Sequence, residues 1–174
     1  MTSNIRISIF CPDRVGLISA ITGKLFDLGI NLGDTNFAVL GTGAEYAAVC
    51  ETHSELDIEE IEEHLKSLPE LENADISVNR FDLSSVHGPT ASITHRITIK
   101  GGDNPGLVAR LSEVFVEFKA NIVRLNSEKI PGEAGNQYLI DFSVWIPEES
   151  TESCLATISN TANTLQMHCQ VKKV

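Results

Sequence analysis

Positively charged side chains are scarce in this sequence of 174 residues. It has 13 lysine and arginine residues against 24 aspartate and glutamate residues, which gives a formal net charge of −11. Proteins bind a nucleic-acid backbone mainly through clustered lysine and arginine, and these residues form no cluster along this chain. We therefore expect no direct contact with nucleic acid.

Long apolar runs are also absent. No run approaches the roughly 20 residues that a membrane-spanning helix needs, and the first residues lack the basic and then apolar pattern of a secretion signal. The sequence is 42% hydrophobic and 21% charged, a composition typical of a globular protein with a packed core. The sequence predicts a cytoplasmic protein that does not enter a membrane.

Signatures of metal binding and catalysis are missing too. The four cysteines at 11, 50, 154 and 169 show no C-x-x-C spacing, so we expect reduced and mostly buried thiols. The five scattered histidines lack metal-ligand spacing, and neither a G-x-S-x-G nor an H-E-x-x-H motif occurs. These absences predict a protein that is not an enzyme and that holds neither a metal nor a cofactor.

An internal repeat organises the chain. Residues 5–32 align without a gap on residues 95–122 at a constant offset of 90, and seven of the 28 positions are identical. About two identities are expected from average composition. The identical pairs are Arg6/Arg96, Ile7/Ile97, Ile9/Ile99, Asp13/Asp103, Gly16/Gly106, Leu17/Leu107 and Asn31/Asn121.

The second halves of the repeats match as a pattern. Both carry a helical stripe with the spacing i, i+3, i+7, i+10, at an offset of 97: Ile58, Ile61, Leu65 and Leu68, then Leu155, Ile158, Ala162 and Leu165. The second repeat has thus gained seven residues, which we place in the Pro/Gly-marked segment 129–136. With a Ser/Gly/Pro-containing linker at 83–92, the predicted domains are residues 1–82 and 93–174.

Each repeat is expected to run strand, helix, strand, strand, helix, strand. This order predicts the α+β class, with two ferredoxin-like βαββαβ sandwiches whose antiparallel sheets carry both helices on one face. Gly29 is expected to end the first helix at its C′ position. The second and fourth strands become sheet edges, and edges of two units can pair within one chain or between chains. A homodimer is one arrangement that this fold allows.

The loops that join the first strand of each repeat to its helix are the candidate site. They span residues 11–17 and 101–107. A helix start presents free N–H groups and a partial positive charge, which favour a carboxylate or a phosphate. Gly16 and Gly106 permit close approach of a ligand or of another backbone, and Asn31 and Asn121 offer an amide donor and acceptor.

Each of these residue types also has a structural interpretation. Aspartate is a preferred N-cap residue, so Asp13 and Asp103 are expected to act chiefly as helix caps. The two glycines could equally allow a helix to pack closely on its sheet. The two asparagines fit a turn as well as a ligand contact.

The same segments resemble the ACT domain, a small regulatory module that binds small molecules. D-R-V-G-L-I-S-A-I-T…G-I-N-L and D-N-P-G-L-V-A-R-L-S…A-N-I are similar to the family pattern of Asp-Arg-Pro-Gly-Leu-Leu followed by Asn-Ile. The resemblance covers nearly the whole chain, twice over. Two bare ACT domains in a short chain are similar to the glycine cleavage system transcriptional repressor group, whose members regulate transcription by engaging another regulator.

The resemblance implies ligand contacts in the two loops and at the asparagine after each first helix. The implied ligand-binding residues are Asp13, Arg14, Val15, Gly16, Leu17, Asn31, Asp103, Asn104, Gly106, Leu107 and Asn121. Val15 replaces the usual proline and Asn104 the frequent arginine. Because Val15 keeps its N–H and Arg14 can clamp a carboxylate through two hydrogen bonds, we expect the first loop to bind an anion better than the second.

The function implied is that of a non-catalytic, amino-acid-responsive regulator that acts through protein–protein contacts. The family suggests glycine or serine as the effector and a transcription factor as the protein partner. An alternative is an ACT-type regulatory subunit of an amino-acid biosynthetic enzyme. A third reading, a small acyl-phosphate hydrolase, would need Arg14 and Asn31 in one loop. An acidic stretch around residues 55–63 is interpreted as a solvated helix face, or else as a docking surface for a basic protein.

Overall fold

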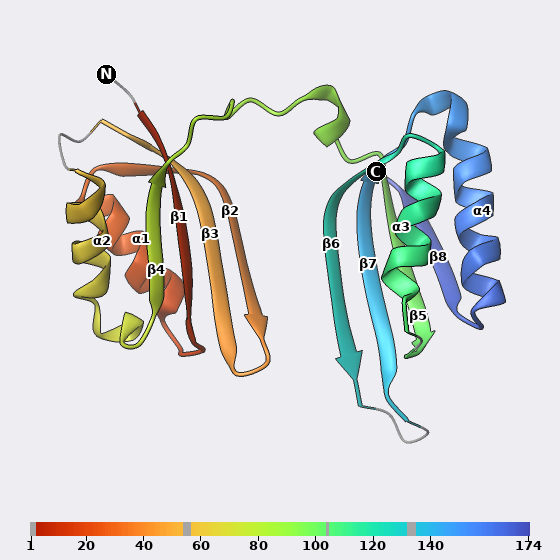
Figure 1. Ribbon diagram of the computed structural model, residues 1–174, viewed down its shortest axis with the longest axis horizontal. Helices are drawn as coiled ribbons and strands as arrows, with labels where there is room; N and C mark the ends of the chain where they lie inside the picture. The colour runs from red at the N-terminus through yellow and green to blue at the C-terminus, as the bar shows by residue number, and fades with distance from the viewer. Residues whose placement is uncertain (1–2, 54–56, 104, 132–134) are drawn as a thin grey trace. The chain divides into compact units, whose positions relative to one another are not determined.

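The computed structural model describes residues 3–53, 57–103, 105–131 and 135–174. The chain forms two compact units, and the boundary between them in the sequence falls between Ser85 and Val86 (Figure 1). No helix in these described ranges is long and apolar enough to cross a membrane. Within the same ranges, no three His, Cys, Asp or Glu side chains are grouped as a metal ion would require.

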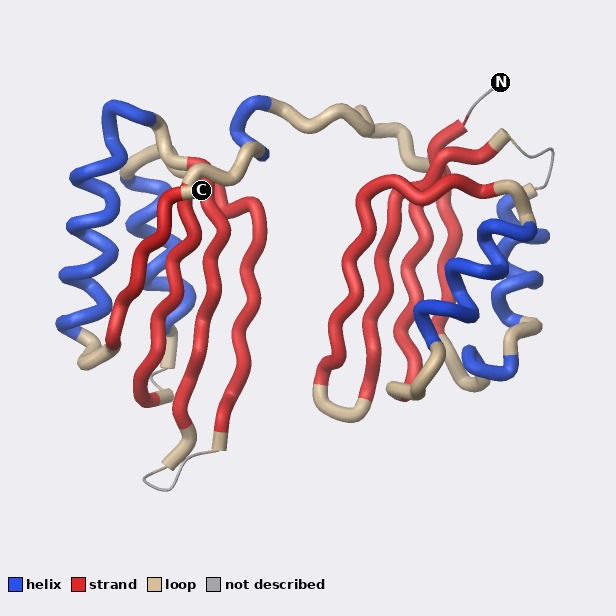
Figure 2. The backbone as a smooth tube through the Cα atoms, turned by 180° about the vertical axis from the view of Figure 1, so that it is seen from behind, coloured by secondary structure: helices blue, strands red, loops and turns tan. Residues whose placement is uncertain are grey.

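The first unit has the predicted order of elements. Its strands and helices are β1 (Ser3–Pro12), α1 (Leu17–Asp27), β2 (Ile30–Leu40), β3 (Gly43–Thr52), α2 (Ile58–Lys66), the 3-10 helix η1 (Pro69–Leu71) and β4 (Asp75–Arg80). The sheet order is β2-β3-β1-β4, with antiparallel neighbours throughout. Both helices lie on one face of the sheet (Figure 2).

The second unit repeats this plan. Its elements are η2 (Pro89–Ala91), β5 (His95–Gly102), α3 (Leu107–Glu117), β6 (Asn121–Ile130), β7 (Gln137–Trp145), η3 (Glu148–Ser150), α4 (Thr151–Thr164) and β8 (His168–Lys173). Its antiparallel sheet has the order β6-β7-β5-β8. The predicted α+β class, with two ferredoxin-like sandwiches, is confirmed, and β2, β4, β6 and β8 are the sheet edges.

The strand register divides the extra residues of the second unit between two places. Cys11 pairs with Ala44 and Gly101 pairs with Tyr138, so the offset rises from 90 to 94 across the hairpin turn. The helical stripes keep the offset of 97, because Ile61 and Ile158 are both buried core residues. Only four of the seven residues therefore lie in the predicted hairpin segment, and the others lie between β7 and α4, where η3 forms.

Each unit has its own core, built from alternate strand residues and one stripe of each helix. In the first unit the alternation Ile5, Ile7, Ile9 is buried, as predicted. In the second, Phe115 and Phe142 meet edge to face with ring centroids 5.3 Å apart, where the equivalent positions of the first unit hold Leu25 and Ala48. The two units thus share a backbone arrangement, but side chains of different size pack their cores.

The four cysteines are free thiols, three of them buried and Cys169 half-buried. Burial raises the pKa of Cys50 and of Cys154 to about 11. Both thiols are therefore protonated at neutral pH and behave as small apolar core residues.

Candidate functional site

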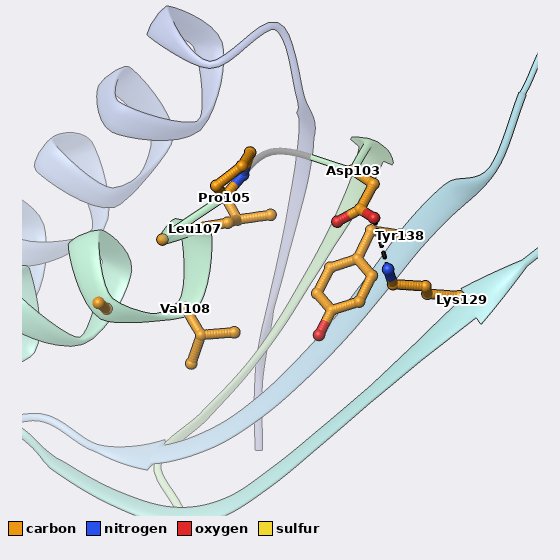
Figure 3. A pocket seen from close by; sticks show the side chains of 8 residues that line it. Asp103, Pro105, Leu107, Val108, Lys129 and Tyr138 are labelled. Carbon is orange, nitrogen blue, oxygen red and sulfur yellow. Dashed lines mark ion pairs between the residues drawn. The ribbon is translucent and has the colours of Figure 1, made fainter. Parts of the chain in front are cut away.

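An open pocket of about 290 Å³ lies where β5 of the second unit leads into α3 (Figure 3). It is lined by the loop after β5, the first turn of α3 and the facing ends of the β6–β7 hairpin. The lining residues are Asp103, Pro105, Gly106, Leu107, Val108, Ala109, Lys129 and Tyr138. Three of the predicted site residues, Asp103, Gly106 and Leu107, are therefore brought together here.

Two opposite charges meet at the edge of this pocket. The Lys129 ammonium lies 2.6 Å from Oδ2 of Asp103, and the two side chains are 59% and 39% exposed. The hydrogen bond and the charge of Asp103 raise the pKa of Lys129, so the ammonium stays protonated at neutral pH. Because the pair is open to solvent, it contributes little to stability and its partners can be exchanged at low cost.

The strand register places Lys129 and Tyr138 opposite each other on the helix-facing side of the hairpin. The Tyr138 hydroxyl lies 3.1 Å from Oγ of Ser127, to which it donates. Figure 3 shows the phenol ring beside the Asp103–Lys129 pair, with Val108 across from it on the first turn of α3. The pocket therefore combines a cation, an anion and an apolar wall.

The start of α3 supplies the backbone donors. Arg110 makes the first backbone hydrogen bond of the helix, from its N–H to the Gly106 carbonyl at 3.0 Å. The N–H groups of Leu107, Val108 and Ala109 precede it and have no partner within the helix. They belong to residues that line the pocket, and the helix dipole adds a partial positive charge at this end. This arrangement suits an anionic group of a ligand.

The predicted capping by Asp13 and Asp103 is wrong. Both helices begin after a glycine in the left-handed region, Gly16 at φ 96° and Gly106 at φ 75°, and neither helix has a side-chain cap. A Cβ added to either glycine would meet no described atom within 4 Å. The glycines are therefore required by their backbone conformation rather than by close packing.

The first unit uses its equivalent loop differently. Nη1 of Arg14 donates to the carbonyls of Pro69 and Glu70 at 3.0 and 3.3 Å, and Nη2 donates to that of Glu72 at 3.1 Å. The guanidinium therefore ties the loop to η1, so it is not free to clamp a ligand carboxylate as expected. The adjacent Val15 is fully exposed.

The remaining predicted residues are not gathered at the loops of their own units. Asn31 pairs with Glu51 near the start of β1, whereas the loop follows Pro12 at the other end of that strand. This separation from Arg14 contradicts the acyl-phosphate hydrolase reading. Asn121 lies at the corresponding place, and its side-chain amide donates to the Thr90 carbonyl at 2.9 Å. Asn104 lies outside the described residues.

Sequence reasoning missed Lys129 and Tyr138. They are nine residues apart and lie in and beside the segment interpreted as an insertion. The first unit has Val39 and Ala44 at the equivalent places. The signal that could have revealed them is the departure from the repeat, because a lysine and a tyrosine replace two apolar residues beside a shared loop.

Comparison with known proteins places this geometry in a family. The ACT domain model matches residues 5–70, so the first unit is an ACT domain. The second unit repeats its element order and sheet order, so the chain holds an ACT domain followed by a second unit of the same ferredoxin-like fold.

Two solved structures share the fold over nearly their full lengths. An unknown protein from Galdieria sulphuraria is 22% identical with a TM-score of 0.78, and the alignment covers 100% of this chain and 99% of that one. A candidate glycine cleavage system transcriptional repressor is 15% identical with a TM-score of 0.69, covering 100% and 98%. Identities this low establish the fold alone. A search among curated proteins found no match.

Proposed function

We propose that this ACT-domain regulatory protein binds a small free amino acid at the pocket beside α3 and transmits the binding to a protein partner, without catalysing a reaction. The observation that carries the proposal is the Asp103–Lys129 pair at the mouth of that pocket. A free amino acid is a zwitterion, and this pocket offers one group of each charge.

The ligand is proposed to enter by exchanging the ion pair for two new ones. The α-ammonium of the amino acid takes the place of Lys129 beside the Asp103 carboxylate. Its α-carboxylate accepts hydrogen bonds from the Lys129 ammonium and from backbone N–H groups at the start of α3. The charges of the protein stay balanced in both states, so the exchange avoids leaving a carboxylate or an ammonium unpaired.

The apolar wall sets a limit on the side chain of the ligand. Leu107 is buried and Val108 is half-buried, so the pocket between them and Tyr138 accommodates a small side chain rather than a charged one. Glycine and serine are therefore the first effectors to test, as the family resemblance also suggests.

The partner is proposed to be a regulator of transcription. This choice follows the shared fold and chain length with the candidate glycine cleavage system repressor and the acidic net charge of −11, which disfavours direct contact with DNA. A ligand shifts a conformational equilibrium only by its differential affinity for the two states. The effector must therefore bind one state of the regulator more tightly than another.

A thermal-shift screen of the full chain against the twenty amino acids at millimolar concentration tests the effector. Ligand at 100 times its Kd adds about 2.7 kcal/mol to the free energy of unfolding, a rise of several degrees in Tm for a domain of this size. We expect a response to glycine or serine. Acetate and methylamine, each carrying only one of the two charges, are expected to give no shift.

Variants connect the response to this pocket. Lys129→Gln and Asp103→Asn each remove one charge of the pair, and both are expected to abolish the thermal shift while changing the Tm of the free protein little. Asp13→Asn is the matched control, because Asp13 holds the equivalent position in the first unit. Absence of any response in the unmodified protein, or an equal loss in the Asp13→Asn variant, would refute the proposed site.

A further inference from the structure

Three cations lie in one row across the sheet of the second unit. Arg96 on β5 pairs with Lys172 on β8 and with Ser143 on β7. Ser143 in turn pairs with Arg124 on β6. Paired residues of neighbouring strands have side chains on the same face of a sheet, so Lys172, Arg96, Ser143 and Arg124 form one line over all four strands. We call these residues the cation row.

The cation row lies on the face that the helices leave uncovered. Ile97 and Phe142, which follow or precede row residues along their strands, are buried in the core beneath α3 and α4. Because successive side chains of a strand alternate between faces, the row points away from these helices. Figure 2 shows both helices of the unit on the opposite side of the sheet. The three cations are exposed and Ser143 is half-buried.

The charges of the row are not neutralised within the second unit as described. The side chains of Arg96, Arg124 and Lys172 make neither a hydrogen bond nor an ion pair with a described residue. Asp141 lies on this face two residues before Ser143, and its carboxylate accepts a hydrogen bond from the Thr98 hydroxyl. Like charges directly opposite each other destabilise a sheet, so pairing Arg96 with Lys172 has a cost that a bound anion would remove.

The first unit lacks this arrangement. Arg6 occupies the place of Arg96, between Asn79 and Val49. The position equivalent to Arg124 is Asp34. The row therefore sums to zero charge in the first unit and to three positive charges in the second. In a chain with almost twice as many acidic as basic residues, this concentration of unpaired cations on one face is a specific feature of the second unit.

We propose that the cation row is a docking surface for an acidic, extended segment of the protein partner. Strands lie about 4.8 Å apart, so the row spans roughly 14 Å, and an extended chain places alternate side chains about 7 Å apart. Three acidic residues at alternate positions of such a segment therefore cover the row. Because the row spans roughly 14 Å, a chain laid across the sheet can reach all three cations, whereas a small anion cannot.

A protein segment is favoured over a nucleic acid by the charge of the whole chain. At −11 the protein repels a long polyanion, whereas a short acidic segment experiences mainly the local field of the row at physiological salt, where screening acts over about 8 Å. The inference depends on the protein–protein part of the proposed function, and it is independent of the amino-acid site.

The test is fluorescence anisotropy with the full chain and a labelled probe peptide of alternating glutamate and threonine. A peptide with glutamine in place of glutamate is the matched control probe. We expect the glutamate peptide alone to bind, with affinity that falls as salt increases. The double substitution Arg96→Gln with Arg124→Gln is expected to weaken binding roughly tenfold, as the loss of two charge-assisted contacts implies. Arg6→Gln in the first unit should leave it unchanged.

Three results would overturn the docking surface. They are binding of the glutamine peptide as tight as that of the glutamate peptide, unchanged affinity in the double variant, and tighter binding of a single-stranded oligonucleotide through the same two arginines. The amino-acid response separates this test from that of the proposed function. We expect the double variant to keep its thermal shift with amino acid and the Lys129→Gln variant to keep peptide binding, so either proposal can fail without the other.

Discussion

In both units a loop of equal length follows the first strand. The first loop makes hydrogen bonds within its own unit, whereas the second borders an open pocket. In the first unit the Arg14 guanidinium donates hydrogen bonds to three backbone carbonyls around η1. In the second, Asp103 pairs with Lys129 at an exposed pocket. The hairpin beside each loop also differs between the units. Val39 and Ala44 occupy the positions where the second unit has Lys129 and Tyr138.

The comparison teaches how a duplicated fold can separate its tasks. The backbone plan, the left-handed glycine before the first helix and the sheet order are common to both units. The polar chemistry is not shared, since the pocket charges and the cation row both belong to the second unit. The first unit carries the excess of negative charge, with 15 acidic and 5 basic residues between positions 1 and 82.

The largest expected effect comes from breaking the internal role of Arg14. Arg14→Ala removes three hydrogen bonds from a charged donor to backbone carbonyls, and we expect the free energy of unfolding to fall by about 2 kcal/mol. Urea denaturation followed by circular dichroism measures it. Arg6→Ala, which removes an exposed arginine from the same unit, is the control and should change stability by less than about 0.5 kcal/mol. Equal effects of the two variants would show that Arg14 does not anchor its loop.

A smaller effect tests the feature that the loops share. Gly16→Ala and Gly106→Ala force a side chain into the left-handed region, and each is expected to destabilise the protein by about 1 kcal/mol. Gly23 lies inside α1 with ordinary backbone angles and open space around it, so Gly23→Ala should stabilise by roughly 0.5–1 kcal/mol. Chemical denaturation of the three variants measures both signs. Stabilisation by Gly16→Ala would contradict the conformational role of that glycine.

The smallest expected effect is a change in folding stability with pH that arises from a residue of the second unit. His95 is buried where the first unit has Ile5, and burial, followed by the nearby charge of Lys173, lowers its pKa below the ordinary value. The unfolded chain then binds the proton more tightly, so the contribution of neutral His95 to stability is present above about pH 6.5 and decreases as the pH falls toward the folded pKa. Urea midpoints at pH 7.5 and 5.5 are expected to differ less in His95→Ile than in the unmodified protein. An identical difference would contradict this role.

Much of the fold follows from local pattern. The alternation of Ile5, Ile7 and Ile9, the stripe of Leu17, Ile21 and Leu25 and the position of Gly29 each predict an element that the structure contains. These signals involve neighbours in sequence. The strand and helix patterns recur in the second repeat, where Lys119 takes the place of Gly29. The loop after the first strand was predicted as the site for the same reason, since a strand followed by a helix start is a local feature.

The chemistry of the site depended on contacts distant in sequence. Arg14 was expected to bind a ligand, but its acceptors lie 55 to 58 residues further along the chain. Asp103 was expected to cap a helix, but its partner Lys129 comes from a hairpin strand. A side chain of either type has several suitable partners in sequence, and only the packing of the elements selects one.

The amino-acid sequence by itself determined that this chain is two copies of one βαββαβ plan, because strand and helix periods and turn residues act over a few positions. The tertiary structure decided that residues of the second copy line an open pocket and that three of its cations form one line. Arg96, Arg124 and Lys172 are far apart in sequence and form no cluster there. Antiparallel pairing of β6, β7, β5 and β8 brings them into one row, since strand register joins residues by position in space rather than by position in the chain.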